Sequence, residues 1–359
     1  MLMKFTSLSA LFFKKLKTYF NMKSNLIILI FLLSLILNAQ KSDFHHVNFD
    51  KADSISHSLN NAKLHNLPLL AYRLTSKLDT QVEKFRAIYT WVCSNIESDH
   101  NFAEITINKR KKFKNDSISF SNWNSQVQSG MFKKLLNDKK TICSGYAYLV
   151  KELSALANIP CEIVDGYSRT VNTNVNKIDI PNHSWNAVKL NNKWYLVDAT
   201  LSSGFYLVNE NKFIKNYNDG YFLAEPELFS KNHYPLDKKW LLIEDNLSLQ
   251  QFVETPLIYS NTYKKEVIPI SPKKLINEVL IDDYVDFKIK IPENKKIDDF
   301  NLIIVSGLKK EKIEAKTQDY ANGFLNFRHQ FTKKGHYDVH VDVQNDIVIS
   351  YTVEVNKPN

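Results

Sequence analysis

The sequence predicts an α+β protein, with helices packed on an antiparallel sheet and followed by an all-β sandwich of immunoglobulin type. Three observations carry this prediction. Apolar residues recur at helical spacing over 80–96 and 144–157, two strand patterns flank a tight turn within 183–200, and from about residue 257 the chain consists of short alternating runs. With 359 residues, of which 44% are hydrophobic, the chain has material for more than one core.

An apolar run lies near the start of the chain. Residues 26–37, LIILIFLLSLIL, follow Lys23 and precede Ala39. The run is shorter than the ~20 residues that a membrane-spanning helix needs, and a small residue stands at a suitable cleavage point, as in a secretory signal peptide. We expect residues 1–39 to direct export to the periplasm or the extracellular space. An uncleaved membrane anchor is the alternative, because Leu37 stands where a small residue is usual.

Charge argues against nucleic acid as a partner. The formal net charge is +9, but residues 1–40 hold five lysines and no acidic residue, so the remainder has 42 basic and 38 acidic residues. A mildly basic exported protein lacks the strong positive charge that indicates nucleic-acid binding. The run KRKKFK at 109–114 is interpreted as a solvated loop, with contact to an anionic cell-envelope polymer as the alternative.

The chain has three cysteines, Cys93, Cys143 and Cys161. An odd number leaves at least one thiol unpaired or paired between chains, even though export permits disulfides. Their spacing matches no zinc site, and no acidic cluster has calcium-ligand spacing. We therefore expect no metal and no cofactor. The oligomeric state is not predicted.

Two helices are expected in the first part of the chain. Over 80–96 the apolar stripe follows a Thr80-x-x-Glu83 capping box, and Cys93 lies beside the stripe as core filler. The second helix covers about 144–157. Between them, residues 97–130 are rich in Asn, Ser and Lys and are interpreted as a long loop that covers a site.

Strands and short helices are expected next. Residues 161–167 read as a strand containing Cys161, and 183–190 and 193–200 form a hairpin around Asn191-Asn192, a pair that tolerates a type I′ turn. Residues 205–245 are aromatic-rich and irregular. Short helices are expected near 225–230 and 247–253.

The residue pattern changes after Thr255-Pro256, which we take as a domain boundary between 40–255 and 256–359. Seven strand-like runs follow, separated by Asn, Asp, Gly and Pro, as in an immunoglobulin-like sandwich. In one of them, 336–343, alternate residues are expected to face the core and the solvent. The expected buried residues are Tyr337, Val339, Val341 and Val343, and the expected exposed residues are Asp338, His340 and Asp342.

Three polar residues stand where a thiol nucleophile needs them. Cys143 lies at a loop-to-helix junction, where the free N–H groups of a helix N-terminus favour the reactive thiolate. His183 starts one strand of the hairpin and supplies an imidazole base, and Asp198 ends the other strand. Taken singly, each residue is more often structural, so their combination carries the hypothesis.

The hairpin offers a geometric test of this combination. With a two-residue turn at Asn191-Asn192, paired positions sum to 383, and His183 lies on the same face as Asp198 as a diagonal neighbour. A three-residue turn would move Asp198 to the other face unless a bulge restored it. The triad hypothesis therefore depends on the parity of this turn.

These segments resemble a known family. TICSGYAYLVKELSALANIPCEIVDGY and NHSWNAVKLNNKWYLVDAT resemble the transglutaminase-like superfamily core, a papain-like fold with a Cys-Gly-Tyr/Phe helix start and His-Ala/Ser-Trp and Trp-Tyr-x-x-Asp strands. EKFRAIYTWVCSNI resembles the preceding helix. YFLAEPELFSKNHYPLDKKWLLI resembles a segment of the branch that includes kyphoscoliosis peptidase. The resemblance covers roughly residues 79–255.

The resemblance implies a role for each of the three residues: Cys143 as nucleophile, His183 as general base and then acid, and Asp198 as the group that orients the imidazole. Ser203-Gly204-Phe205 departs from the family pattern, where a tryptophan often follows the aspartate, which leaves the substrate contacts open. The Cys143 backbone N–H is expected to stabilise the oxyanion. Candidate second donors are Trp123, Gln126 and Gln128. Residues that line the cleft or, alternatively, fill the core are Tyr146, Tyr167, Trp185 and Tyr206.

The sequence leaves three functions open. The leading hypothesis is an exported cysteine peptidase or amidase that hydrolyses a peptide or glutamine amide of a protein or peptide substrate, in which the cell envelope is one source of substrate. The second is an inactive scaffold that keeps the fold, and the third is a transamidase that crosslinks proteins. Membrane contact is expected only through an uncleaved signal segment.

Overall fold

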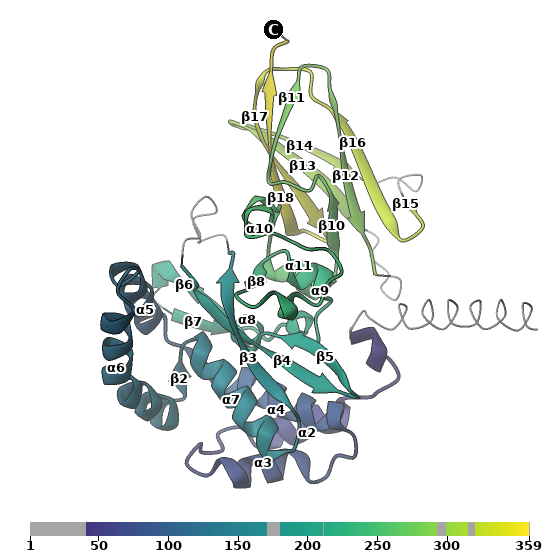
Figure 1. Ribbon diagram of the computed structural model, residues 1–359. Coiled ribbons are helices and arrows are strands. Elements are labelled where there is room, and N and C mark those ends of the chain that lie inside the picture. Colours follow the sequence, from purple (N-terminus) through teal and green to yellow (C-terminus); the bar gives the residue numbers. More distant parts are fainter. Residues whose placement is uncertain (1–40, 171–179, 211, 293–298, 315–319, 359) are drawn as a thin grey trace, which may run out of the picture. The chain divides into compact units, whose positions relative to one another are not determined.

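The computed structural model describes residues 41–358 except 171–179, 211, 293–298 and 315–319. The predicted signal segment, 1–39, lies outside the described residues. Among the helices that are described, none is long and apolar enough to cross a membrane. The fold mixes helices and sheets, as predicted (Figure 1).

Helices come first in the described chain. A short 3-10 helix, η1, precedes them, and a parallel pair of two-residue strands, β1 and β2, joins the two ends of one helical segment. The elements are η1 (Lys41–Phe44), α2 (Asp50–Ser58), α3 (Leu67–Thr75), α4 (Gln81–Asn95), β1 (Glu97–Ser98), α5 (His100–Lys112), α6 (Ser117–Asp138), β2 (Lys140–Thr141) and α7 (Cys143–Leu156).

An antiparallel sheet of four strands follows, in the order β5-β4-β3-β8, and helix α7 packs against β3 and β4 (Figure 1). Short elements surround it. The elements are β3 (Cys161–Ser168), β4 (His183–Leu190), β5 (Lys193–Val197), α8 (Ala199–Ser203), β6 (Gly204–Leu207), η2 (Val208–Glu210), β7 (Lys212–Lys215), η3 (Asp219–Tyr221), α9 (Pro226–Phe229), β8 (His233–Pro235), η4 (Lys238–Leu241) and α10 (Leu249–Glu254).

Helix α4 has the predicted start and the predicted burial. Thr80 and Glu83 form a reciprocal capping box, which satisfies two backbone donors that a helix start otherwise leaves free. The helix buries most of its length, and Cys93 is 1% exposed within it. The interpretation of Cys93 as core filler is confirmed.

The β4–β5 hairpin has the predicted two-residue turn. Leu190 pairs with Lys193 and Asn186 with Val197, so paired positions sum to 383. Asn191 and Asn192 have φ values of 47° and 67°, as a type I′ turn requires. The parity on which the triad hypothesis depends is therefore the even one.

Residues 97–130 are not the long loop that their polar composition predicted, because most of them are helical. Asp99 caps α5 by accepting from the Phe102 N–H at 3.2 Å, and Asp116 caps α6 by accepting from the Ser119 N–H at 2.9 Å. The basic run 109–114 was predicted as a solvated loop, but it includes the last turn of α5. Positive charge there interacts favourably with the negative end of the helix dipole. Side-chain caps and charges that complement the helix dipole therefore stabilise these two helices, although few of their side chains are buried.

Two sheets make up most of the chain after residue 256. One has the order β10-β12-β16-β15 and the other β11-β18-β17-β13-β14, with β9 paired to β18 (Figure 1). All pairs are antiparallel except β11 with β18. The elements are β9 (Leu257–Ile258), α11 (Ser260–Lys265), β10 (Ile268–Ser271), β11 (Ile276–Leu280), β12 (Tyr284–Lys290), β13 (Phe300–Ser306), β14 (Lys309–Glu314), β15 (Tyr320–Ala321), β16 (Phe324–Gln330), β17 (Gly335–Val343) and β18 (Asp346–Asn356).

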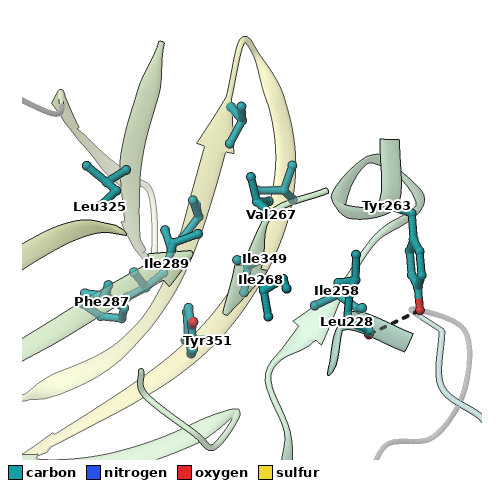
Figure 2. Close-up of a cluster of buried hydrophobic side chains, with 14 of the residues drawn as sticks. Leu228, Ile258, Tyr263, Val267, Ile268, Phe287, Ile289, Leu325, Ile349 and Tyr351 are labelled. Carbon is teal, nitrogen blue, oxygen red and sulfur yellow. Dashed lines mark hydrogen bonds between the residues drawn. The ribbon is translucent and has the colours of Figure 1, made fainter. Parts of the chain in front are cut away.

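The two sheets bury their apolar faces against each other. The ring of Phe287, from β12, lies 5.3 Å from that of Tyr351, from β18 (Figure 2). The same cluster of buried side chains includes Trp185 of the first sheet and Leu228 of α9, so one continuous core runs from the four-stranded sheet to both later sheets. The hydrophobic core therefore continues across Thr255-Pro256, the predicted domain boundary.

Strand β17 follows the predicted alternation only in part, since Tyr337, expected to be buried, and His340, expected to be exposed, are both half-buried. Val339, Val341 and Val343 are buried as expected, but Asp342 is also buried, at 5% exposure. The register with β18 shifts between Val341 and Asp342, and the Asp342 carboxylate accepts a hydrogen bond from Asn301 Nδ2 at 3.0 Å. The extra residue at this point is Val348 of β18, while Asp342 stays in register with Asn301 of β13, whose amide satisfies the buried carboxylate.

Candidate active site

Cys143 is the first residue of α7. The residue before it, Ile142, caps the helix with extended backbone angles, φ −102° and ψ 178°, and without a side-chain hydrogen bond. The residue as a whole is half-buried. The positive end of the helix dipole therefore lies at the sulfur, where it favours the thiolate.

His183 and Asp198 meet across the hairpin, as the turn parity predicted. His183 is the first residue of β4, and Asp198 follows β5 directly. The distance between His183 Nε2 and Asp198 Oδ2 is 2.6 Å. Both residues are buried, and the Asp198 side chain is fully so. A hydrogen bond of this length is typical of a pair of opposite charges.

Asp198 accepts four hydrogen bonds within the described chain. Its Oδ1 accepts from the Thr200 and Leu201 N–H groups at 2.8 and 3.0 Å, because Asp198 is the N-cap of α8. Its Oδ2 accepts from His183 and also from His233 Nε2, at 3.0 Å. Burial alone would raise the pKa of Asp198, but these partners hold it well below its ordinary value. A buried carboxylate with every lone pair occupied stays ionised.

The imidazole of His183 lies between Asp198 and Cys143. Burial opposes its protonation, yet the charge and hydrogen bond of Asp198, together with the hydrogen bond to Cys143, raise the pKa of His183 to about 10. Burial also opposes ionisation of the thiol, but the hydrogen bond and charge of His183 lower the pKa of Cys143. The site therefore favours a thiolate–imidazolium pair at neutral pH.

Arg110 adds positive charge to this site, and sequence reasoning did not single it out. Its charge further lowers the pKa of Cys143, and its Nη1 donates to the Pro181 carbonyl at 2.8 Å. The guanidinium also lies 6.0 Å from the ring centre of Phe120. Helix α5 thus brings part of the basic run to the segment that precedes His183.

The other two cysteines have a different environment. Cys93, Cys143 and Cys161, all within the described chain, are free thiols, but only Cys143 is not buried. Burial raises the pKa of Cys161 to about 12 and raises that of Cys93 as well. A neutral buried thiol is a poor nucleophile. Reactivity is therefore expected at Cys143 alone.

The predicted substrate contacts divide into buried and accessible residues. Tyr146 and Trp185 are 0% and 1% exposed, so they fill the core, the second of the two interpretations, and offer no surface to a substrate. Tyr167 and Tyr206 are half-buried. On α6, Trp123 is half-buried against Phe120, and Gln126 and Gln128 are exposed.

Sequence reasoning also missed His233. It is the first residue of β8, and its only signal in the sequence is that it lies within YFLAEPELFSKNHYPLDKKWLLI, the segment that resembles the kyphoscoliosis peptidase branch, which by itself gives the residue no role. His183, Asp198 and His233 offer three atoms within 4.8 Å of one another, a spacing that could hold a metal ion. Both histidine Nε2 atoms, however, already donate to Asp198 at 2.6 and 3.0 Å. A zinc ion would have to replace both hydrogen bonds.

Comparison with known proteins indicates the family. Residues 69–199, which include all three site residues, match the family model described as the transglutaminase-like superfamily. Over these residues the chain carries a transglutaminase-like domain. It is 32% identical to human kyphoscoliosis peptidase over 249 residues, 64% of this chain and 34% of that protein. It is also 33% identical to the mouse kyphoscoliosis peptidase, over 56% of this chain and 28% of that protein, so both matches point to similarity with the kyphoscoliosis peptidase-like branch.

A more distant relative is hillarin of Drosophila melanogaster, 24% identical over 229 residues, 60% of this chain and 25% of that protein. The match spans about a third or less of the length of these relatives.

Proposed function

We propose that this chain is an exported thiol hydrolase, a cysteine peptidase or amidase that acts on a peptide or glutamine amide. Cys143 is the nucleophile, His183 the base and acid, and Asp198 the residue that orients the imidazole. The observation that carries the proposal is the hydrogen bond between His183 and the buried Asp198, with Cys143 at a helix start where His183 lowers the pKa of its thiol. The transglutaminase-like domain supports an enzymatic role.

The proposed reaction has two halves. The Cys143 thiolate attacks the amide carbon, and the His183 imidazolium gives its proton to the leaving nitrogen as the C–N bond breaks, which leaves a thioester. A water molecule then gives its proton to His183 while its oxygen attacks the thioester carbon. The acid leaves and Cys143 is again a thiolate. Asp198 stays ionised throughout and holds the imidazole in one tautomer.

The oxyanion of each half needs donors near the sulfur. The Cys143 backbone N–H at the start of α7 is one proposed donor. For the second donor we retain Trp123, because its ring contacts Phe120, which itself lies near the Arg110 guanidinium. Gln126 and Gln128 lie on the same helix but are exposed.

The test is hydrolysis of peptides and of cell-wall fragments by the wild-type protein, by Cys143→Ala and by the matched control Cys161→Ala. We expect Cys143→Ala to lose at least about 1,000-fold in kcat/KM, as other removed nucleophiles do. Cys161→Ala should retain most activity, because Cys161 is buried in β3. Equal activity of wild type and Cys143→Ala on every cleaved substrate would contradict the proposal.

Two other functions give different results in the same screen. A transamidase would release ammonia from a glutamine peptide and incorporate a labelled amine instead of water. An inactive scaffold would show no turnover and no enhanced reactivity of Cys143. The thiolate-stabilising contacts of Cys143 favour an active site over a scaffold, because a scaffold has no need of them.

We further propose that residues 1–39 direct export and that the later sheets form an immunoglobulin-like domain that attaches the enzyme to cell-envelope material. Two packed sheets with mainly antiparallel strands support the second part. Sequencing the N-terminus of the mature protein after cell fractionation tests the first part. A mature chain in the cytoplasm that still begins at Met1 would contradict it.

A further inference from the structure

We propose that His233 is a positioning residue of the active site: it donates to the same Asp198 oxygen that receives His183, and thereby sets how firmly the carboxylate holds the imidazolium. The inference rests on the proposed function, because it concerns the same triad. It adds a fourth member, which comes from the strand β8 and has no place in the predicted triad.

The geometry of Asp198 gives His233 a distinct place. Oδ1 is held by the N–H groups at the start of α8, so the carboxylate cannot turn freely. Oδ2 is shared between two imidazoles, with His183 Nε2 at 2.6 Å and His233 Nε2 at 3.0 Å. His233 therefore acts on the one oxygen atom through which Asp198 acts on His183.

The ring of His233 has a fixed orientation. It stacks on Phe229 with ring centres 3.8 Å apart and an angle of 15°, and meets Trp185 edge-on at 5.1 Å. Its backbone pairs with Ser168 of β3, and the residue is 1% exposed. Since packing fixes the ring on these sides, its Nε2 is directed at Asp198.

The protonation of His233 follows from its surroundings. The ionisable side chains that face it are Asp198, His183 and Tyr263. Burial lowers the pKa of His233 even though Asp198 favours the charged form. At neutral pH the ring is therefore neutral, and because Asp198 is ionised, the single proton lies on Nε2. His233 is thus a neutral donor, in contrast to the protonated His183.

Tyr263 supports the far side of this ring. Its hydroxyl lies 3.5 Å from His233 Nδ1 and donates to Asn232 Oδ1. Tyr263 is fully buried in α11, beyond residue 256, and its ring stacks on Tyr221 at 4.0 Å (Figure 2 shows Tyr263 beside Leu228). A residue of the later part of the chain thus contacts the proposed fourth member of the site.

The chemical consequence concerns the acid role of His183. A second N–H on Oδ2 disperses the negative charge of Asp198, so the carboxylate holds the His183 proton less firmly. The His183 imidazolium is then a stronger acid, and its other ring nitrogen, on the Cys143 side, passes its own proton to the leaving nitrogen more readily. Without the His233 donor, the imidazolium is held more firmly, the thiolate persists to lower pH, and proton delivery slows.

The experiment compares His233→Gln, whose amide N–H can reach the position of Nε2, with His233→Phe, which keeps an aromatic ring and loses the donor. Each full-length variant is assayed for kcat and KM on a peptide that the wild type cleaves. Each is also alkylated with iodoacetamide between pH 4 and 9, with labelling of Cys143 followed by mass spectrometry. Should His233→Phe fail to fold, His233→Asn is the second donor-less variant, because its shorter amide does not reach Oδ2.

We expect the donor-less variant to lose about tenfold or more in kcat with little change in KM, as for other residues that orient a catalytic group. The acid limb of Cys143 alkylation should move to lower pH by roughly half a unit to one unit, the size of one hydrogen bond. His233→Gln should keep the wild-type limb and most of kcat.

An unchanged limb and kcat in the donor-less variant would overturn the inference, and so would a lower melting temperature without any shift of the limb, since packing alone would produce that. Equal loss in a folded His233→Gln would also overturn it. Failure of the proposed function looks different: the wild type itself would then show no turnover and no enhanced alkylation at Cys143.

Discussion

Helices α6 and α7 are neighbours in the chain and differ in what they bury. The 14 residues of α7 bury an apolar stripe against the sheet, and the helix carries Cys143 at its start. Of the 22 residues of α6, only Leu135 is fully buried. Each helix contains one glycine, Gly145 or Gly130. The difference teaches that α7 is specified by tertiary packing and α6 by local capping, so equal substitutions should have unequal effects.

The largest effect is expected from Gly145→Ala in α7. A Cβ at residue 145 would lie 1.9 Å from Thr141 Oγ1 and 2.8 Å from Thr141 Cβ. Overpacking of this kind costs about 1–3 kcal/mol in the free energy of unfolding and shifts the backbone nearby. Because residue 145 is two positions after Cys143, kcat and Cys143 alkylation should fall as well. Urea unfolding measures the first effect and alkylation rates the second. Wild-type values in this variant would contradict the conclusion that α7 is specified by close packing.

A smaller effect is expected at the turn that sets the register of His183 and Asp198. Asn192 has a φ of 67°, which a β-branched residue adopts only with strain. We expect Asn192→Val to lower the free energy of unfolding by about 1–2 kcal/mol, and the matched Asn192→Gly to leave it unchanged or slightly higher. Urea unfolding of the two variants measures the difference. A tolerated valine would contradict the type I′ turn.

The smallest effect is expected from Gly130→Ala in α6. A Cβ there would meet nothing within 4 Å, and alanine is about 0.5–1 kcal/mol better than glycine inside a helix. Hydrogen exchange of the α6 amides should therefore slow, while global unfolding changes less, since α6 contributes little to the core. Faster exchange, or a destabilised protein, would show that α6 packs more closely than its exposure indicates.

The elements that were predicted correctly are those that bury a regular pattern. The even turn at Asn191-Asn192 and the apolar stripe after Thr80 are local patterns that each fit one structure. The turn alone predicts that His183 and Asp198 lie on the same face, as they do in the fold. Two of the seven strand-like runs expected after Thr255-Pro256, YVDFKIKI and FNLIIV, likewise correspond to strands β12 and β13.

The failures have physical reasons. Residues 97–130 carry few buried side chains, so their sequence lacks the apolar periodicity that predicts a helix. The prediction also left out the helix caps at Asp99 and Asp116. Strand β11 (Ile276–Leu280) was missed because it lies at a sheet edge and pairs in parallel with a distant segment. His233 reaches the site only through pairing of β8 with β3, a long-range contact that no local pattern encodes.

The pH dependence of thiol alkylation tests the central claim most directly. The hydrogen bond and charge of His183 lower the pKa of Cys143, and the pKa of His183 is about 10. The thiolate should therefore persist as pH falls below 8 and be lost only below the lowered pKa, while its imidazolium partner is lost as pH rises through about 10. Iodoacetamide should therefore still label Cys143 below pH 8, where an ordinary thiol reacts slowly, and leave the buried Cys93 and Cys161 unlabelled. Labelling of Cys143 that rises with pH near 8.5, as for an ordinary thiol, would contradict the account.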